Sequence, residues 1–299
     1  MFKQLQSYFP SFKDGFFTTS DNVKIHYIEA GTGEPLILTS GWPTTPCIFA
    51  YNLEALAKHY RVIAIETRGT GESEKVTYGY RVSRTAKDVY DMLIALGITK
   101  ANFIGHSMGC STLWAFIDLF GQSMINKLIL VDQSPWLWSN VAESDESMDL
   151  HAGHRGNPYG LYNAFVQSWD VGNTAFTEPE YWPTAWSSIE NSTEDSLKVM
   201  ALEAEYRQQN NYPREALARL LVNHYMTDWR DIIQIISVPT LIITGSYSHA
   251  INAQTTEWMH NAIKGSKLIV FGNNEGGNHI MMANSPEKFN REVLNFLTK

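Results

Sequence analysis

In residues 105–109 a serine, Ser107, lies between two glycines in the pattern G-x-S-x-G. An apolar run, 101–104, precedes this pattern, and a helix-like run, 111–120, follows it. A strand, a tight turn and a helix in this order form a nucleophile elbow, in which the serine hydroxyl stands clear of the sheet above the helix N-terminus. The glycines leave room where a Cβ would clash, so the turn can hold the serine in a strained conformation. We therefore expect Ser107 to act as a nucleophile.

A serine hydroxyl is not ionised at neutral pH, so it needs a neighbouring base to take its proton. His279 is the expected base, because it lies in a glycine-rich loop after the last apolar strand. His249 also follows a predicted strand, and we expect an exposed loop histidine there. His151 and His154 have the spacing of a metal-binding pair, but no third ligand is evident, so we expect no metal site.

A catalytic serine and histidine are usually completed by a carboxylate that orients the imidazole and stabilises its cation. Asp132 ends the strand that directly follows the elbow helix. It comes after Ser107 and before His279, which keeps the chain order nucleophile, acid, base. The alternative is that Asp132 only caps the turn formed by residues 133–135. We expect Asp132 to be the acid.

The elements that must position these residues alternate between strands and helices. Residues 16–20 and 23–30 have the polar–apolar alternation of a hairpin. Continuous apolar runs are typical of strands buried on both faces of a parallel sheet, and they lie at 36–38, 61–66, 127–131, 238–244 and 267–271. Helical spacing fits 52–59, 82–96, 255–263 and 286–297. This alternation predicts an α/β fold with a mostly parallel sheet and helices on both faces.

Between residue 134 and about residue 230 the strand pattern stops. Helices fit residues 161–169, 193–208 and 214–225 in this segment. We interpret residues 134–230 as an inserted helical lid, which divides the core into residues 1–133 and 231–299. The lid contains Trp136, Trp138 and Trp186, and as a group these favour a large apolar substrate pocket. The alternative for each tryptophan is that it only holds the lid to the core.

Charge and hydropathy exclude several classes of function. The net charge is −8, so no basic face for nucleic acid is expected. The first ten residues lack the apolar segment of a signal peptide, and no apolar run approaches the roughly 20 residues of a membrane span. Two cysteines do not suggest a disulfide framework. We expect a cytoplasmic protein with no membrane partner and no cofactor, whose oligomeric state the sequence leaves open.

The order of these elements and motifs resembles the α/β-hydrolase fold family. Four places beyond the elbow carry the resemblance: Ser40-Gly41-Trp42-Pro43 at the oxyanion loop, R-G-T-G-E-S at 68–73, V-P-T-L-I-I-T-G at 238–245, and Gly277-Asn278-His279 followed by Ser285-Pro286. The resemblance covers the chain apart from the lid. It implies that the His279 loop returns to the elbow, and that the backbone N–H groups of Trp42 and Met108 form an oxyanion hole.

The chain departs from the commonest pattern of this family at two positions. Ser40 stands where the oxyanion loop usually has histidine. Ser248 stands where the acid usually follows the late strand, and no carboxylate appears until Glu257. Some family members carry their acid at the position of Asp132. A serine cannot stabilise an imidazolium by charge, so the sequence assigns no role to Ser248, and we expect its replacement by alanine to change little.

The residues and the resemblance together predict a serine hydrolase that cleaves a carboxylic ester or lactone with a bulky apolar body through an acyl-enzyme. A macrocyclic lactone would suit a large aromatic lid. Serine at the elbow argues against epoxide hydrolases and haloalkane dehalogenases, which resemble this fold but use aspartate there. One alternative is a cofactor-independent dioxygenase on the same fold, disfavoured because the oxyanion loop contains no histidine. The other is a non-catalytic ligand receptor on this scaffold.

Overall fold

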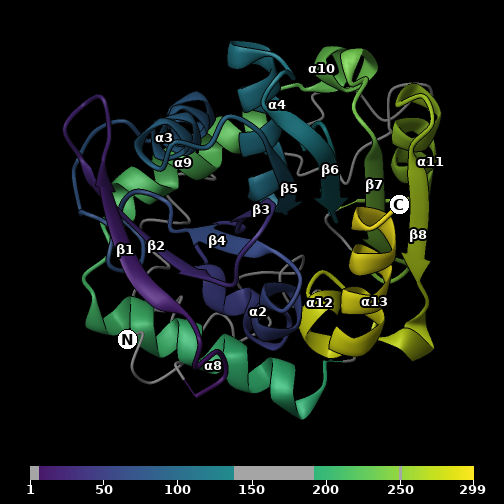
Figure 1. Cartoon of the computed structure of the whole chain (residues 1–299), viewed down its shortest axis with the longest axis horizontal. Helices are drawn as coiled ribbons and strands as arrows, with labels where there is room; N and C mark the ends of the chain where they lie inside the picture. Colours follow the sequence, from purple (N-terminus) through teal and green to yellow (C-terminus); the bar gives the residue numbers. More distant parts are fainter. Residues whose placement is uncertain (1–6, 138–191, 249–250) are drawn as a thin grey trace.

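The computed structural model describes residues 7–137, 192–248 and 251–299 of the 299-residue chain. The described strands form one sheet in the order β1-β2-β4-β3-β5-β6-β7-β8 (Figure 1). The first pair, β1 (Lys13–Thr18) and β2 (Lys24–Ala30), is the predicted hairpin, and β2 is antiparallel to both of its neighbours. The other strands are parallel: β3 (Pro35–Thr39), β4 (Arg61–Ile65), β5 (Ala101–His106), β6 (Ile125–Val131), β7 (Thr240–Gly245) and β8 (Lys267–Phe271).

Helices cover both faces of this sheet, as the alternating pattern predicted (Figure 1). One face packs against α3 (Val82–Ala95), α4 (Met108–Phe120), α10 (Arg230–Ile235) and α11 (Ala253–Ala262). The other packs against η1 (Pro46–Phe49), α2 (Ala50–Ala57), α12 (Met281–Asn284) and α13 (Pro286–Leu297). A short turn of helix, η2 (Asn273–Glu275), follows β8. The mostly parallel α/β sheet is therefore confirmed.

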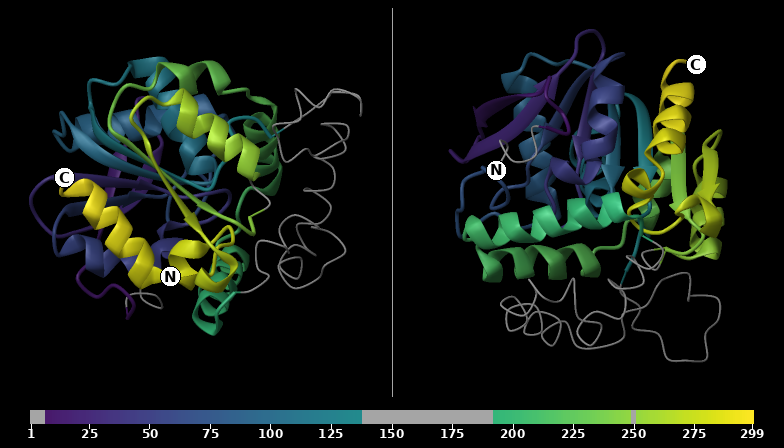
Figure 2. Two further views of the ribbon diagram at one scale, coloured as in Figure 1. Left: turned by 90° about the vertical axis from the view of Figure 1, so that its right-hand side faces the viewer. Right: turned by 90° about the horizontal axis from the view of Figure 1, so that it is seen from below.

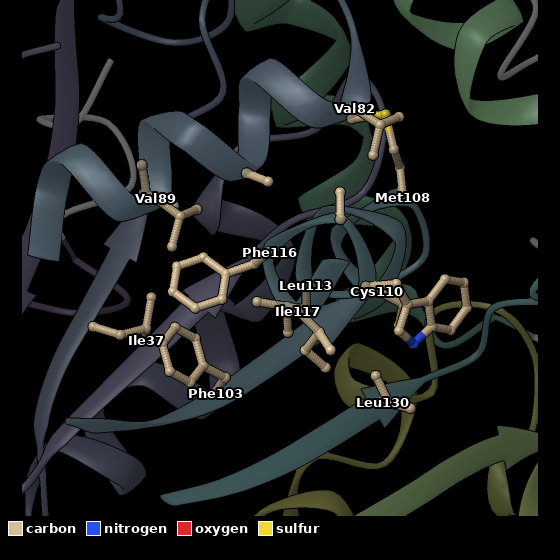
Figure 3. Packing of buried hydrophobic residues seen from close by; sticks show 14 of the residues in the cluster. Ile37, Val82, Val89, Phe103, Met108, Cys110, Leu113, Phe116, Ile117 and Leu130 are labelled. Carbon is tan, nitrogen blue, oxygen red and sulfur yellow. The ribbon is translucent and has the colours of Figure 1, made fainter. Parts of the chain in front are cut away.

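The core beneath the elbow is built from aromatic and aliphatic side chains of β5, α3 and α4. Figure 3 shows Phe103 of β5 beside Phe116 of α4, with their ring centroids 5.7 Å apart. Val82 and Val89 of α3 belong to the same buried cluster. Strands buried on both faces send alternate residues to the two sides, so Ile37 enters this cluster while its neighbours in β3 enter the opposite one. The elbow thus sits on a closely packed base.

Two further helices, α8 (Glu194–Gln209) and α9 (Arg214–Met226), are drawn in green in Figure 2, and each contacts the loop that follows β3 through a hydrogen bond, from Thr45 to Glu203 of α8 and from Trp42 to Leu217 of α9. They confirm the helices predicted at 193–208 and 214–225. The helix predicted at 161–169 lies outside the described residues, and the lid boundaries at 134 and 230 stay a prediction. Among the described helices, none is both long and apolar enough to serve as a membrane span.

Candidate active site

Ser107 lies in a sharp turn between β5 and α4. Its backbone has φ 54° and ψ −129°, a strained conformation for a residue with a side chain. The turn is possible because of the two flanking glycines: a Cβ on Gly109 would lie 2.3 Å from the Thr39 carbonyl oxygen, and one on Gly105 would lie 2.8 Å from the Cys110 nitrogen. The strand, tight turn and helix predicted around Ser107 are therefore present.

Asp132 and His279 meet although 147 positions separate them in the chain. Asp132 follows β6, is 2 % exposed and has a φ of 55°. Its Oδ2 lies 2.5 Å from Nδ1 of His279. Its Oδ1 accepts hydrogen bonds from the Thr244 hydroxyl, at 3.0 Å, and from the Gly245 N–H, at 3.1 Å. The loop that carries His279 thus returns to the carboxyl end of β6, beside β7.

A second side chain donates to the oxygen of Asp132 that faces the histidine. Ser248 Oγ lies 2.5 Å from Asp132 Oδ2. The residue that replaces the usual acid in the sequence is therefore in contact with the acid that the sequence predicted. His249, which follows it, lies outside the described residues.

Ser107 lies at the same edge of the sheet as Asp132, since its backbone N–H donates to the carbonyl of Val131, the residue before Asp132, at 3.0 Å. A Cβ placed on Gly41 would lie 3.3 Å from both Ser107 Oγ and His106 Nδ1, and the His106 ring centroid is 4.7 Å from that of His279. The hydrogen bonds of the described residues do not include one from Ser107 Oγ to His279. Hydrogen bonds of this kind are often long in free enzymes and shorten when substrate binds.

The loop after β3 lies against the serine, where an oxyanion hole would be needed. A Cβ on Gly41 would come within 2.9 Å of Ser107 Cβ, so only glycine lets the loop approach this closely. The next residue, Trp42, is held by its indole Nε1, which donates to the Leu217 carbonyl of α9 at 2.9 Å. Met108 is the first residue of α4, where N–H groups have no intrahelical acceptor. Gly41, which precedes Trp42, and Met108 therefore both adjoin the serine, and the oxyanion hole formed by the N–H groups of Trp42 and Met108 stays a prediction.

Comparison with known proteins identifies the family. A family model described as the alpha/beta hydrolase fold matches residues 34–280. The chain belongs to the α/β-hydrolase fold family. The chain is 26 % identical over 289 residues to a non-heme chloroperoxidase of Kitasatospora aureofaciens, a match that covers 94 % of this chain and 98 % of the relative.

Solved structures of other α/β-hydrolase fold proteins match nearly the whole chain. An esterase from Exiguobacterium antarcticum has a TM-score of 0.79 at 22 % identity and covers 95 % of this chain and 99 % of its own. An enol-lactonase from Burkholderia xenovorans has a TM-score of 0.75 at 22 % identity, covering 95 % and 100 %. At these identities the likeness establishes the fold alone.

Two buried histidines of this α/β-hydrolase lie near His279. His106 lies under the elbow; its Nε2 is 2.8 Å from the His279 carbonyl oxygen, to which it donates, and its ring packs edge-on against Phe49. Burial and the neighbouring His279 lower the pKa of His106 to about 3. The same causes lower the pKa of His224, on α9, to about 3. Both rings are therefore neutral at physiological pH and add no positive charge beside His279. The sequence assigned His224 only to a helix and gave no signal of its position near the site.

A buried carboxyl group joins α8 to the loop after β3. Glu203 Oε1 accepts from the Thr45 hydroxyl at 2.6 Å and from the Thr45 N–H at 3.0 Å, and the Glu203 side chain is fully buried. Burial raises the pKa of Glu203 to about 7, although the bonds from Thr45 and the charge of Arg207 favour the carboxylate. This contact fixes the loop three residues after Trp42, and the sequence did not predict it.

We expect Glu203→Gln to alter how stability depends on pH. Between the ordinary value of 4.5 and the raised value of about 7, folded wild type holds a proton that the unfolded chain releases, so its stability falls as the pH rises through this window. Glutamine keeps an acceptor for Thr45 and does not titrate. The free energy of unfolding of the variant minus that of wild type should therefore rise by about 3 kcal/mol from pH 4.5 to pH 8.

Urea unfolding at pH 4.5, 6 and 8 measures this difference. Glu205→Gln, at an exposed position of the same helix, is the matched control and should leave the pH dependence of wild type unchanged. If Glu203→Gln and wild type lost stability in parallel over this range, the buried carboxyl group would not be the cause.

The tryptophans predicted to line the pocket are only partly described. Trp136 is half-buried, and the Arg230 guanidinium carbon lies 4.4 Å from the centre of its ring. Trp138, Trp186, His151 and His154 lie outside the described residues. Within the described ranges, no group of three or more His, Cys, Asp or Glu side chains could hold a metal ion.

Proposed function

We propose that this chain is a serine hydrolase of carboxylic esters or lactones, with Ser107 as nucleophile, His279 as base and Asp132 as acid. The observation that carries the proposal is the 2.5 Å contact between Asp132 Oδ2 and His279 Nδ1, beside a serine held at a positive φ. The names of the relatives alone do not choose an activity, since they include a chloroperoxidase, an esterase and an enol-lactonase.

In the proposed reaction His279 Nε2 takes the proton of Ser107 as Oγ bonds to the substrate carbonyl carbon. The charge that develops on the carbonyl oxygen is received by the N–H groups of Trp42 and Met108. His279 then gives the proton to the leaving alkoxide oxygen, the C–O bond breaks, and an acyl-enzyme remains. Water attacks this ester with His279 again as base, which releases the acid and restores Ser107. Asp132 stabilises the imidazolium that forms in each half.

The proposed substrate is a small molecule with a bulky apolar body. Tryptophan is frequent in the segment between β6 and α8, and aromatic side chains give a large apolar contact area at a small cost in conformational entropy. A lactone fits the same chemistry: its leaving alcohol stays attached to the acyl group, so hydrolysis gives a single hydroxy acid. Trp136, Trp138 and Trp186 are proposed to contact this substrate.

Ser107→Ala tests the proposal, because it removes the oxygen that must form the acyl-enzyme. We expect wild type to be labelled by a fluorophosphonate and the variant not to be labelled at all. Hydrolysis of p-nitrophenyl esters and of a macrocyclic lactone should fall by about 10⁵- to 10⁶-fold. Mass spectrometry of the labelled chain and initial rates measure the two effects.

The control is Ser123→Ala, which changes an exposed serine and should behave as wild type. Labelling that survives in Ser107→Ala would refute the nucleophile. Wild type that consumes oxygen without ester hydrolysis would indicate a dioxygenase instead. Tight binding of a ligand without turnover would indicate a receptor.

A further inference from the structure

The carboxylate of Asp132 is held by four donors, two on each oxygen. Thr244 Oγ1 and the Gly245 N–H donate to Oδ1, at 3.0 and 3.1 Å. Ser248 Oγ and His279 Nδ1 share Oδ2, each at 2.5 Å. Three of these donors come from the end of β7 and the loop behind it. That segment therefore determines which way the carboxylate faces.

We propose that Ser248 is a positioning residue that orients Asp132 Oδ2 toward His279. This inference rests on the proposed function and extends it to a residue that the sequence left without a role.

The orienting effect follows from the geometry of the four bonds. The terminal torsion of an aspartate side chain has a broad energy minimum, so a carboxylate held at one oxygen still rotates. Thr244 and Gly245 hold Oδ1, and Ser248 holds Oδ2 in the direction of Nδ1. From the sequence, Ser248 was expected to contribute little to activity because its side chain carries no charge. An O–H group without charge can fix the orientation of the acid and leave its negative charge opposite the imidazole.

The test is the rate constant of fluorophosphonate labelling between pH 5 and pH 9. In this reaction Ser107 Oγ bonds to phosphorus, fluoride leaves, and the proton of the hydroxyl passes to His279. Ser248→Ala should label about 10- to 100-fold more slowly, and Ser248→Thr, which keeps the hydroxyl, should recover to within about threefold of wild type. In Ser248→Ala the acidic limb of the pH profile should move about half a pH unit upward, because Oδ2 keeps more negative charge for the imidazolium when it loses a donor.

Among the residues that the structure describes, the titratable groups that face His279 are Asp132, His106 and His224. The pKa of each of the two histidines is lowered to about 3 by burial, so neither changes charge between pH 5 and pH 9. Burial raises the pKa of the Cys110 thiol, which therefore stays protonated in this range.

The positioning role would be overturned if Ser248→Ala were labelled at the wild-type rate. It would also be overturned if Ser248→Ala were labelled slowly with an unchanged pH profile and Ser248→Thr did not restore the rate. As a further control, Ser107→Ala is combined with each Ser248 variant. Labelling that persists in these double variants would refute Ser107 as the nucleophile and with it the proposed function, which is a different result from failure of the positioning role.

Discussion

Asp132→Asn is expected to slow labelling and ester hydrolysis by about 10⁴-fold without unfolding the protein. The change is isosteric, and the hydrogen bonds around the carboxylate decide which way the new amide faces. Thr244 and Gly245 both donate to Oδ1, so the amide oxygen must take that place. The amide NH₂ then faces His279 and donates to Nδ1. The imidazole is left with its proton on Nε2, in the tautomer that cannot accept a proton from Ser107.

The measurement is kcat/KM for a p-nitrophenyl ester together with a thermal melt followed by circular dichroism. Asp118→Asn is the matched control, since it removes one carboxylate from an exposed position of α4 and should leave both values as in wild type. If Asp132→Asn retained activity within tenfold of wild type, the acid would have to be sought elsewhere. A large fall in melting temperature would instead indicate that the carboxylate mainly holds β6 to β7.

The predictions from sequence were strongest where short patterns have one structural meaning. Glycines on both sides of Ser107 predicted a tight turn, and the structure gives each glycine a backbone neighbour that a Cβ would strike. The continuous apolar runs predicted the parallel strands, because a strand that is buried on both faces has apolar side chains at successive positions and not only at every second one. Asp132 was predicted as the acid because it ends the strand that follows the elbow helix, and the structure brings its carboxylate to His279. In the sheet β6 lies between β5 and β7, which brings the ends of these strands to one edge.

What the sequence did not predict depends on contacts between distant segments. Glu203 and Thr45 are 158 positions apart, and no spacing rule joins a helix residue to a loop at that distance. The position of His224 near His279 likewise depends on how α9 packs. Ser248 was set aside by an argument from charge, whereas its contact with Asp132 is a matter of orientation. Knowing that β6 pairs with β7 would have placed Thr244 beside Asp132, since Val131 and Ile243 are partners in the sheet.

Gly109→Ala should destabilise the protein by at least about 2 kcal/mol and abolish labelling of Ser107. Inside a helix this substitution normally stabilises by up to about 1 kcal/mol, so the expected sign is reversed. The reason is the approach of α4 to β3: the new Cβ would lie 2.3 Å from the Thr39 carbonyl oxygen, a backbone atom fixed by its strand. Thr39 Oγ1 also donates to the Gly109 carbonyl at 3.2 Å, so the helix cannot withdraw without losing this bond.

Urea unfolding and fluorophosphonate labelling measure the two effects. The matched control is Gly272→Ala, because its φ of −71° suits alanine and its Cβ would meet only Glu275 Oε2 at 3.5 Å. That variant should stay within about 0.5 kcal/mol of wild type and be labelled normally. Should Gly109→Ala prove as stable as wild type and still be labelled, the close contact between helix and strand would not be what holds the serine in place. The strained φ of Ser107 would then need another support, and the packing of α4 on β3 would not explain the reactivity of this hydroxyl.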